Sequence, residues 1–112
     1  MEETVEEMEY IYNIIIGRNA QENWDIIDSA DQNDIWFHLE GHPSPHVILK
    51  TGGVKLKEIE KNVIKICAMH CKEHSKFANI RKITVIYTEI KNVSKANKVG
   101  AVYTKNIHHI VI

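Results

Sequence analysis

Trp36, His38 and His46 are the residues of this chain whose types and spacing point most directly to binding chemistry. Trp36 and His38 are two positions apart, so in an extended strand both side chains lie on the same face. An exposed indole ring can stack on a nucleic-acid base, and an imidazole can hydrogen-bond a phosphate or a base edge. The same imidazoles can instead brace a turn. The pattern predicts a polar and aromatic face suited to an anionic ligand.

Further basic and amide side chains extend this set of candidates. No acidic residue follows Glu89, so the lysines after it have no nearby acid in the sequence. Such lysines are often merely solvated, but a basic surface also attracts nucleic acid. The residues that we predict to bind nucleic acid are Arg18, Asn19, Trp36, His38, His46, Lys50, Lys91, Lys95 and Lys98.

A metal site is the first rival interpretation. Cys67, His70, Cys71 and His74 follow helical spacing and are all possible zinc ligands. Ligands from consecutive turns of one helix cannot easily surround a tetrahedral ion. We therefore expect no metal site, and no motif indicates a cofactor.

Catalysis is the second rival interpretation. His38 and His46 with Lys50 could supply the acid, base and charge stabilisation for phosphodiester cleavage. The sequence contains no phosphate-binding loop, nucleophile elbow or carboxylate cluster. We therefore expect a binding protein, with a histidine-dependent phosphodiesterase as a less favoured alternative.

Strands and helices that position these residues are indicated by hydrophobic periodicity. Apolar residues at helical spacing predict one long amphipathic helix over 55–76 and a short one over 21–29. Runs rich in β-branched residues predict strands over 10–16, 35–39, 46–50, 83–88, 99–104 and 108–112. Short connections favour antiparallel pairing. The predicted fold is α+β, with a mostly antiparallel five- or six-stranded sheet packed against the long helix.

The strands 35–39 and 46–50 can pair as a hairpin in one register that separates apolar from polar residues. It places apolar pairs on the core face and polar or aromatic pairs on the outer face. The expected pairs are Phe37 with Val47, Ile35 with Leu49, Trp36 with Ile48, His38 with His46, and Asp34 with Lys50.

The 112 residues and ordinary composition suit a single domain. Residues 1–9 are acidic, and we interpret them as a flexible lead before a domain over 10–112. No apolar run predicts a membrane span or a signal peptide. Two cysteines form no disulfide framework, which favours a reducing compartment.

Three ordered blocks carry a family resemblance: residues 17–23 (GRNAQEN), 34–38 (DIWFH) and 43–49 (PSPHVIL). With the later blocks 85–88 (VIYT), 91–93 (KNV) and 99–100 (VG), they resemble the NFACT-R domain over about residues 11–112. That family includes C-terminal domains of ribosome-associated quality-control factors and small proteins that carry the domain alone.

The resemblance implies a cytoplasmic nucleic-acid-binding module acting in translation or ribosome-associated quality control. The expected partner is RNA, either tRNA or ribosomal, with DNA and ribosome-associated proteins left open. A protein-docking adaptor on a translation complex is the alternative. The larger family members also carry an N-terminal domain and a coiled-coil arm, so their tail-directing activity is not transferred to this chain.

Overall fold

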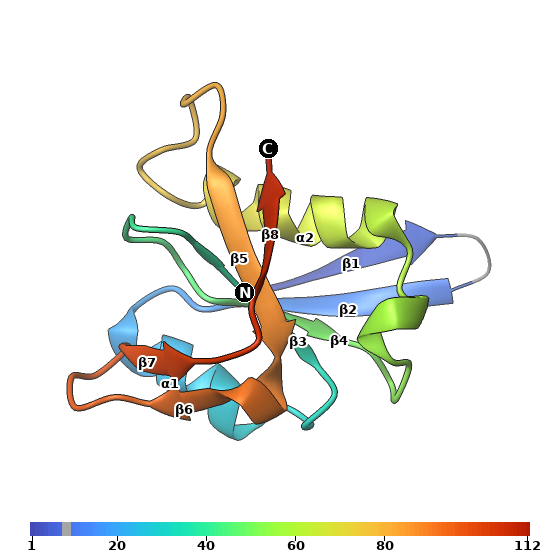
Figure 1. The fold of residues 1–112 in the computed structure, drawn as a ribbon, viewed down its shortest axis with the longest axis horizontal. Coiled ribbons are helices and arrows are strands. Elements are labelled where there is room, and N and C mark those ends of the chain that lie inside the picture. Colours follow the sequence, from blue (N-terminus) through green and yellow to red (C-terminus); the bar gives the residue numbers. More distant parts are fainter. Residues whose placement is uncertain (8–9) are drawn as a thin grey trace.

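Six strands of the chain pair into one antiparallel sheet, as seen in the computed structural model, which describes residues 1–7 and 10–112. The strand order across the sheet is β1-β2-β4-β3-β5-β8 (Figure 1). The strands are β1 (Glu2–Glu7), β2 (Tyr10–Ile16), β3 (Ile35–Leu39), β4 (Val47–Lys50), β5 (Thr84–Glu89) and β8 (His108–Val111).

Helices and a small hairpin cover the two faces of this sheet (Figure 1). Helix α2 (Lys61–Glu73) packs on one face. Helix α1 (Ala20–Asp28) covers the other face together with a hairpin of β6 (Val93–Lys95) and β7 (Val102–Thr104). Two short 3-10 helices, η1 (Leu56–Glu58) and η2 (Ile90–Asn92), complete the α+β fold. No helix in the described ranges is long and apolar enough to cross a membrane.

The predicted register of β3 and β4 is confirmed. Ile35 pairs with Leu49, Trp36 with Ile48, and Phe37 with Val47. Just beyond the strand, buried Asp34 forms an ion pair with Lys50 at 2.9 Å. The alternation of apolar and polar residues along the two strands therefore predicted their register correctly.

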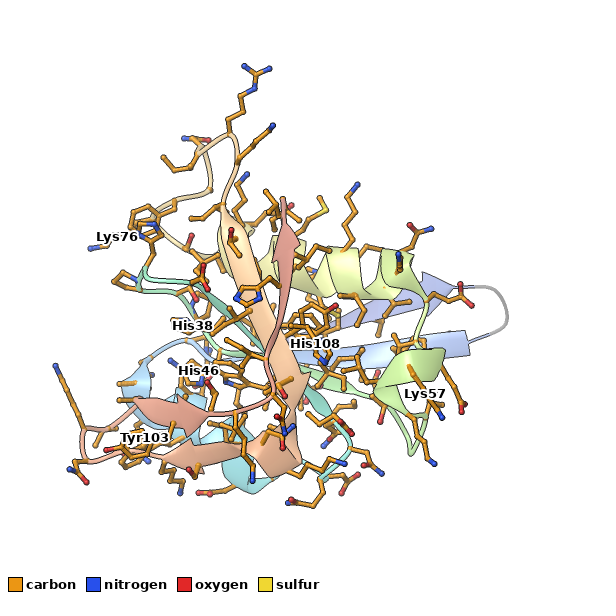
Figure 2. All side chains as sticks on the ribbon, viewed as in Figure 1. His38, His46, Lys57, Lys76, Tyr103 and His108 are labelled. Atoms are coloured by element: carbon orange, nitrogen blue, oxygen red, sulfur yellow. The ribbon has the colours of Figure 1, made fainter. Side chains whose placement is uncertain are left out.

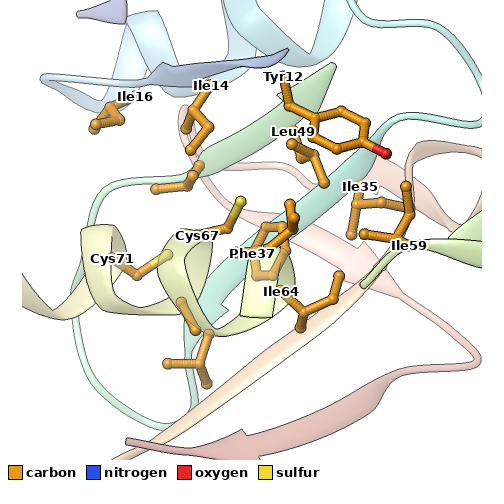
Figure 3. Packing of buried hydrophobic residues seen from close by; sticks show 14 of the residues in the cluster. Tyr12, Ile14, Ile16, Ile35, Phe37, Leu49, Ile59, Ile64, Cys67 and Cys71 are labelled. Atoms are coloured by element: carbon orange, nitrogen blue, oxygen red, sulfur yellow. The ribbon is translucent and has the colours of Figure 1, made fainter. Parts of the chain in front are cut away.

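The main core lies between the sheet and α2 (Figure 3). Phe37, Leu49 and Ile14 contribute from the strands, and Cys67 and Cys71 contribute from the helix. Burial raises the pKa of both cysteine thiols well above the ordinary value. Both cysteines thus act as small apolar core residues in this fold.

A second core fills the opposite face, where the sequence predicted an exposed aromatic surface. Trp36 is only 2% exposed and packs with Ile48 from the sheet and with Ile26 and Ile27 of α1. The expected exposure of the Trp36 ring is therefore wrong, because α1 and the β6–β7 hairpin cover the ring and leave no open face for a base; a contribution of Trp36 to nucleic-acid binding stays a prediction. An alternating pattern identifies the face of a strand but does not show whether that face is covered.

Other predicted boundaries also differ from the structure, among them the start of the strand predicted over 99–104, which is β7 from Val102. The long helix is interrupted, because Ile59 and Glu60 are extended between η1 and α2, and α2 ends at Glu73. Instead of a flexible lead, Glu2–Glu7 forms β1 and pairs with β2. The remainder of the expected lead, residues 8–9, lies outside the described residues.

Candidate nucleic-acid interface

A cleft of about 730 Å³ opens beside the second core. Its walls come from the start of α1, the β3–β4 loop, the turn after α2 and the β6–β7 loop. Arg18, Lys76 and Lys98 contribute positive charge, and His38 and His46 lie among the lining residues. Figure 2 shows both histidines on the same side of β5 as Lys76. No acidic residue lines this cleft in the part of the chain that the structure describes, although the whole chain carries a net charge of −1.

Close backbone approaches hold the walls of the cleft together. The side-chain oxygen of Asn23 accepts a hydrogen bond from the backbone N–H of His46 at 3.1 Å, and a Cβ on Gly17 would overlap that oxygen. Gly100 has a φ of +87°, and a Cβ there would lie 2.9 Å from the Cβ of Ala20. Only glycine therefore lets the β6–β7 loop pack against the start of α1.

A hydrogen bond joins the buried tryptophan to the cleft. Trp36 Nε1 donates to His46 Nδ1 at 3.0 Å. The ring of His38 stacks parallel to the Trp36 ring, with centroids 5.8 Å apart, and meets the edge of the His46 ring at 5.2 Å. The predicted pairing of the two histidines is thus present, and Trp36 supports them from behind.

Both histidines are held neutral near pH 7. Burial, followed by the neighbouring charge of His38, lowers the pKa of His46 to about 3, against a smaller opposing effect of the Gly100 backbone. Burial also lowers the pKa of His38, and the hydrogen bond to the Leu39 carbonyl opposes that shift. Because Trp36 donates to His46 Nδ1, the proton of the neutral His46 ring lies on Nε2.

Arg18, Asn19 and Lys98 also lie at the cleft, as part of the predicted set. The Arg18 side chain is exposed but forms an ion pair with Glu22 at 3.1 Å. That hydrogen bond raises the pKa of Arg18 and lowers the pKa of Glu22. Asn19 has a local structural role, because its Oδ1 caps α1 by accepting from the Glu22 backbone N–H at 2.9 Å. Lys98 has no ion-pair partner among the described residues.

The remaining predicted lysines do not line this cleft. Each has a carboxylate partner: Asp34 for Lys50 at 2.9 Å, Glu89 for Lys91 at 3.5 Å, and Asp28 for Lys95 at 2.6 Å. Their charges are locally balanced, and their contribution to binding stays a prediction.

Three further residues at this surface were not among those predicted from the sequence to bind nucleic acid. His74, Lys76 and Phe77 reach the cleft because the chain turns at Ser75, just after the end of α2. The helix predicted over 55–76 includes Ser75, so the turn was not expected from the sequence. Tyr103 is 61% exposed on the β6–β7 hairpin, outside the residues that line the cleft, and it presents an aromatic ring to solvent where Trp36 does not (Figure 2). The sequence signal for Tyr103 was its position in the strand predicted over 99–104.

Curated relatives match much of the chain. Coiled-coil domain-containing protein 25 from Bos taurus is 35% identical over 86 residues, covering 75% of this chain and 41% of that protein. The Rqc2 homolog RqcH from Bacillus subtilis is 28% identical over 102 residues, covering 88% of this chain and 17% of that protein. The chain therefore spans less than half the length of these relatives.

A solved structure has a similar fold. The C-terminal part of the fibronectin/fibrinogen-binding protein from Streptococcus suis superposes with a TM-score of 0.81 at 21% identity, over 90% of this chain and 40% of that chain. The family model described as NFACT protein RNA binding domain matches residues 3–106. That family is a binding module, and the relatives of the coiled-coil type carry no enzymatic name. The resemblance to the NFACT-R domain is confirmed, and the chain belongs to the family of NFACT protein RNA-binding domains.

Proposed function

We propose that the chain binds RNA through the cleft between α1, the β3–β4 loop, the turn after α2 and the β6–β7 loop. One observation carries this proposal: the described lining residues include Arg18, Lys76 and Lys98 and no acid, in a chain that is acidic overall. Phosphate groups are attracted to such a surface whatever their sequence. Local segregation of charge gives the cleft a field opposite in sign to the net charge of the molecule.

In this proposal the RNA is a tRNA or a ribosome-associated RNA, and the chain acts in the cytoplasm beside the translation machinery. The family description and the similarity to the Rqc2 homolog RqcH support RNA binding or a part in ribosome quality control at a coarse level. Lys50, Lys91 and Lys95 add weaker attraction, because each already has a carboxylate partner.

The experiment is a fluorescence-anisotropy titration of labelled tRNA at several salt concentrations. One variant removes three cleft charges by Arg18→Gln, Lys76→Gln and Lys98→Gln. The matched control removes three exposed charges away from the cleft lining by Lys55→Gln, Lys57→Gln and Lys65→Gln. Figure 2 shows Lys57 and Lys76 on opposite sides of the view.

The two variants should differ in salt dependence. Each phosphate contact contributes about 0.7–0.9 to the slope of log affinity against log salt, so the cleft variant should lose about 2–3 in slope. The control variant should keep the slope of the unmodified chain. Equal losses in both variants would contradict a defined cleft, and a DNA duplex that competes as well as RNA would limit the function to general nucleic-acid binding. Absence of any binding at ~100 mM salt would favour the protein-docking adaptor.

A further inference from the structure

His38 lies where two hollows of the surface meet. It lines the main cleft with His46 and Lys98, and it also lines an adjoining hollow of about 450 Å³ beside Val102. Its ring is fixed in orientation by the parallel Trp36 ring behind it and by the edge of His46. A ligand that fills the main cleft therefore meets His38 in a single orientation.

The local hydrogen bond fixes which ring nitrogen of His38 carries the proton. His38 Nδ1 is 2.6 Å from the carbonyl oxygen of Leu39. A carbonyl oxygen only accepts hydrogen bonds, so Nδ1 is the donor and the neutral ring has an unprotonated Nε2. Nε2 has no hydrogen-bond partner among the residues that the structure describes. The lining of the cleft therefore includes an unused acceptor as well as cationic donors.

This acceptor favours a particular chemistry. Phosphate oxygens are themselves acceptors, so a neutral Nε2 gains nothing from a phosphate. The groups of RNA that can donate to it are the ribose 2′-hydroxyl and the N–H groups of the bases. Lys76 and Lys98 remain available for the phosphates, and Arg18 adds its charge from its ion pair with Glu22.

We infer that His38 Nε2 accepts a hydrogen bond from a ribose 2′-hydroxyl or a base N–H group of the bound RNA, making His38 a specificity-determining residue of the cleft. The inference rests on the proposed function, because it assigns a contact within the same site. It differs from the sequence-based expectation that this histidine could contact phosphate.

The test compares the unmodified chain with His38→Phe, which keeps a ring against Trp36 and removes the acceptor. Both proteins are titrated with a single-stranded RNA and with the 2′-deoxy oligonucleotide of the same sequence, at several salt concentrations. One neutral hydrogen bond corresponds to a loss of about three- to ten-fold in affinity. We expect that loss without a change in the salt slope, because no phosphate contact is removed.

The two sources of the donor give different outcomes. A loss for RNA alone assigns the 2′-hydroxyl, and an equal loss for RNA and 2′-deoxy oligonucleotide assigns a base N–H. A salt slope that falls by about 0.7–0.9 would instead show a phosphate contact and overturn the inference. Unchanged affinity for both oligonucleotides would also overturn it while leaving the proposed function intact. If the unmodified chain binds no RNA, both proposals fail together.

A second measurement needs no substitution, so it stands even if His38→Phe does not fold. Nitrogen NMR of the imidazole rings in the unmodified chain distinguishes protonated from unprotonated ring nitrogens. We expect an unprotonated Nε2 on His38 whose resonance moves on addition of RNA in the direction of an accepted hydrogen bond. A protonated Nε2, or one unaffected by saturating RNA, would overturn the inference.

Discussion

The buried His46 makes the stability of this fold depend on pH, and the size of the effect can be worked out. Burial lowers the pKa of His46 to about 3 in the folded chain, against an ordinary value of 6.5. Between these values the unfolded chain binds a proton that the folded chain does not bind. The free energy of unfolding therefore rises with pH in this window and falls as the pH drops from about 6.5 towards 3.

From pH 8 to pH 5 the expected contribution of this one group is a loss of about 2 kcal/mol. Protonation of His46 Nδ1 would also remove the acceptor for the Trp36 N–H, which is 3.0 Å away in the folded chain. Both effects have the same origin, because the buried site stabilises the neutral ring of His46 relative to the charged ring.

The assay is urea unfolding at a series of pH values for the unmodified chain and for His46→Gln. A glutamine carbonyl can accept from Trp36 and does not titrate in this range. Since the other titrating groups are common to both proteins, the difference between the two profiles isolates His46. We expect the unmodified chain to lose about 2 kcal/mol more than the variant between pH 8 and pH 5. Parallel profiles would refute the conclusion that His46 is buried in its neutral form.

Three further predictions follow from the packing. Gly100→Ala should lower the free energy of unfolding by more than the ~1–2 kcal/mol of a left-handed alanine, because its Cβ would contact α1, and it should also weaken RNA binding. The control is Gly52→Ala, where φ is +64° and nothing lies within 4 Å of the added Cβ; thermal unfolding should show only the backbone cost there. Asp34→Ala should cost roughly 1–3 kcal/mol in urea unfolding, because the buried backbone N–H of Thr51 loses its acceptor and Lys50 loses its ion-pair partner. A loss well below about 1 kcal/mol would contradict this. Cys67 and Cys71 should react with a thiol reagent only as fast as the domain opens, so rapid labelling of the folded chain would contradict their burial.

Local patterns predicted the sheet better than the site. Alternation in residues 35–39 and 46–50 predicted the register of β3 and β4, since a shift of one strand by one residue would have paired core-facing residues with residues of the opposite face. The same alternation could not show that α1 covers Trp36, because the helix and the strand come from different segments and meet only in the folded chain. Helical spacing also continues through Ile59, although the backbone there is extended.

The charges at the cleft also depend on contacts between segments that are distant in the sequence. Lys98 was predicted from the lack of nearby acids in the sequence, and it does lie at the cleft. Lys91 and Lys95 satisfied the same criterion, but Lys91 pairs with Glu89 close by in the sequence and Lys95 pairs with Asp28 from a distant segment. Charge patterns along the chain identify candidates, but only the tertiary contacts decide which charge stays available to a ligand.

The link between the second core and the cleft determines which substitutions can identify a binding residue. Trp36 and His46 are buried, and through them the same hydrogen bond stabilises the core and supports the wall of the cleft. Loss of RNA binding on changing either residue would therefore follow from a displaced wall even without a direct contact. Lys76 and Lys98 have exposed side chains outside both cores, so their removal changes charge with little change in packing. A loss of RNA binding in any variant identifies a contact only when the free energy of unfolding is shown to be unchanged, and Lys76 and Lys98 meet that condition most directly.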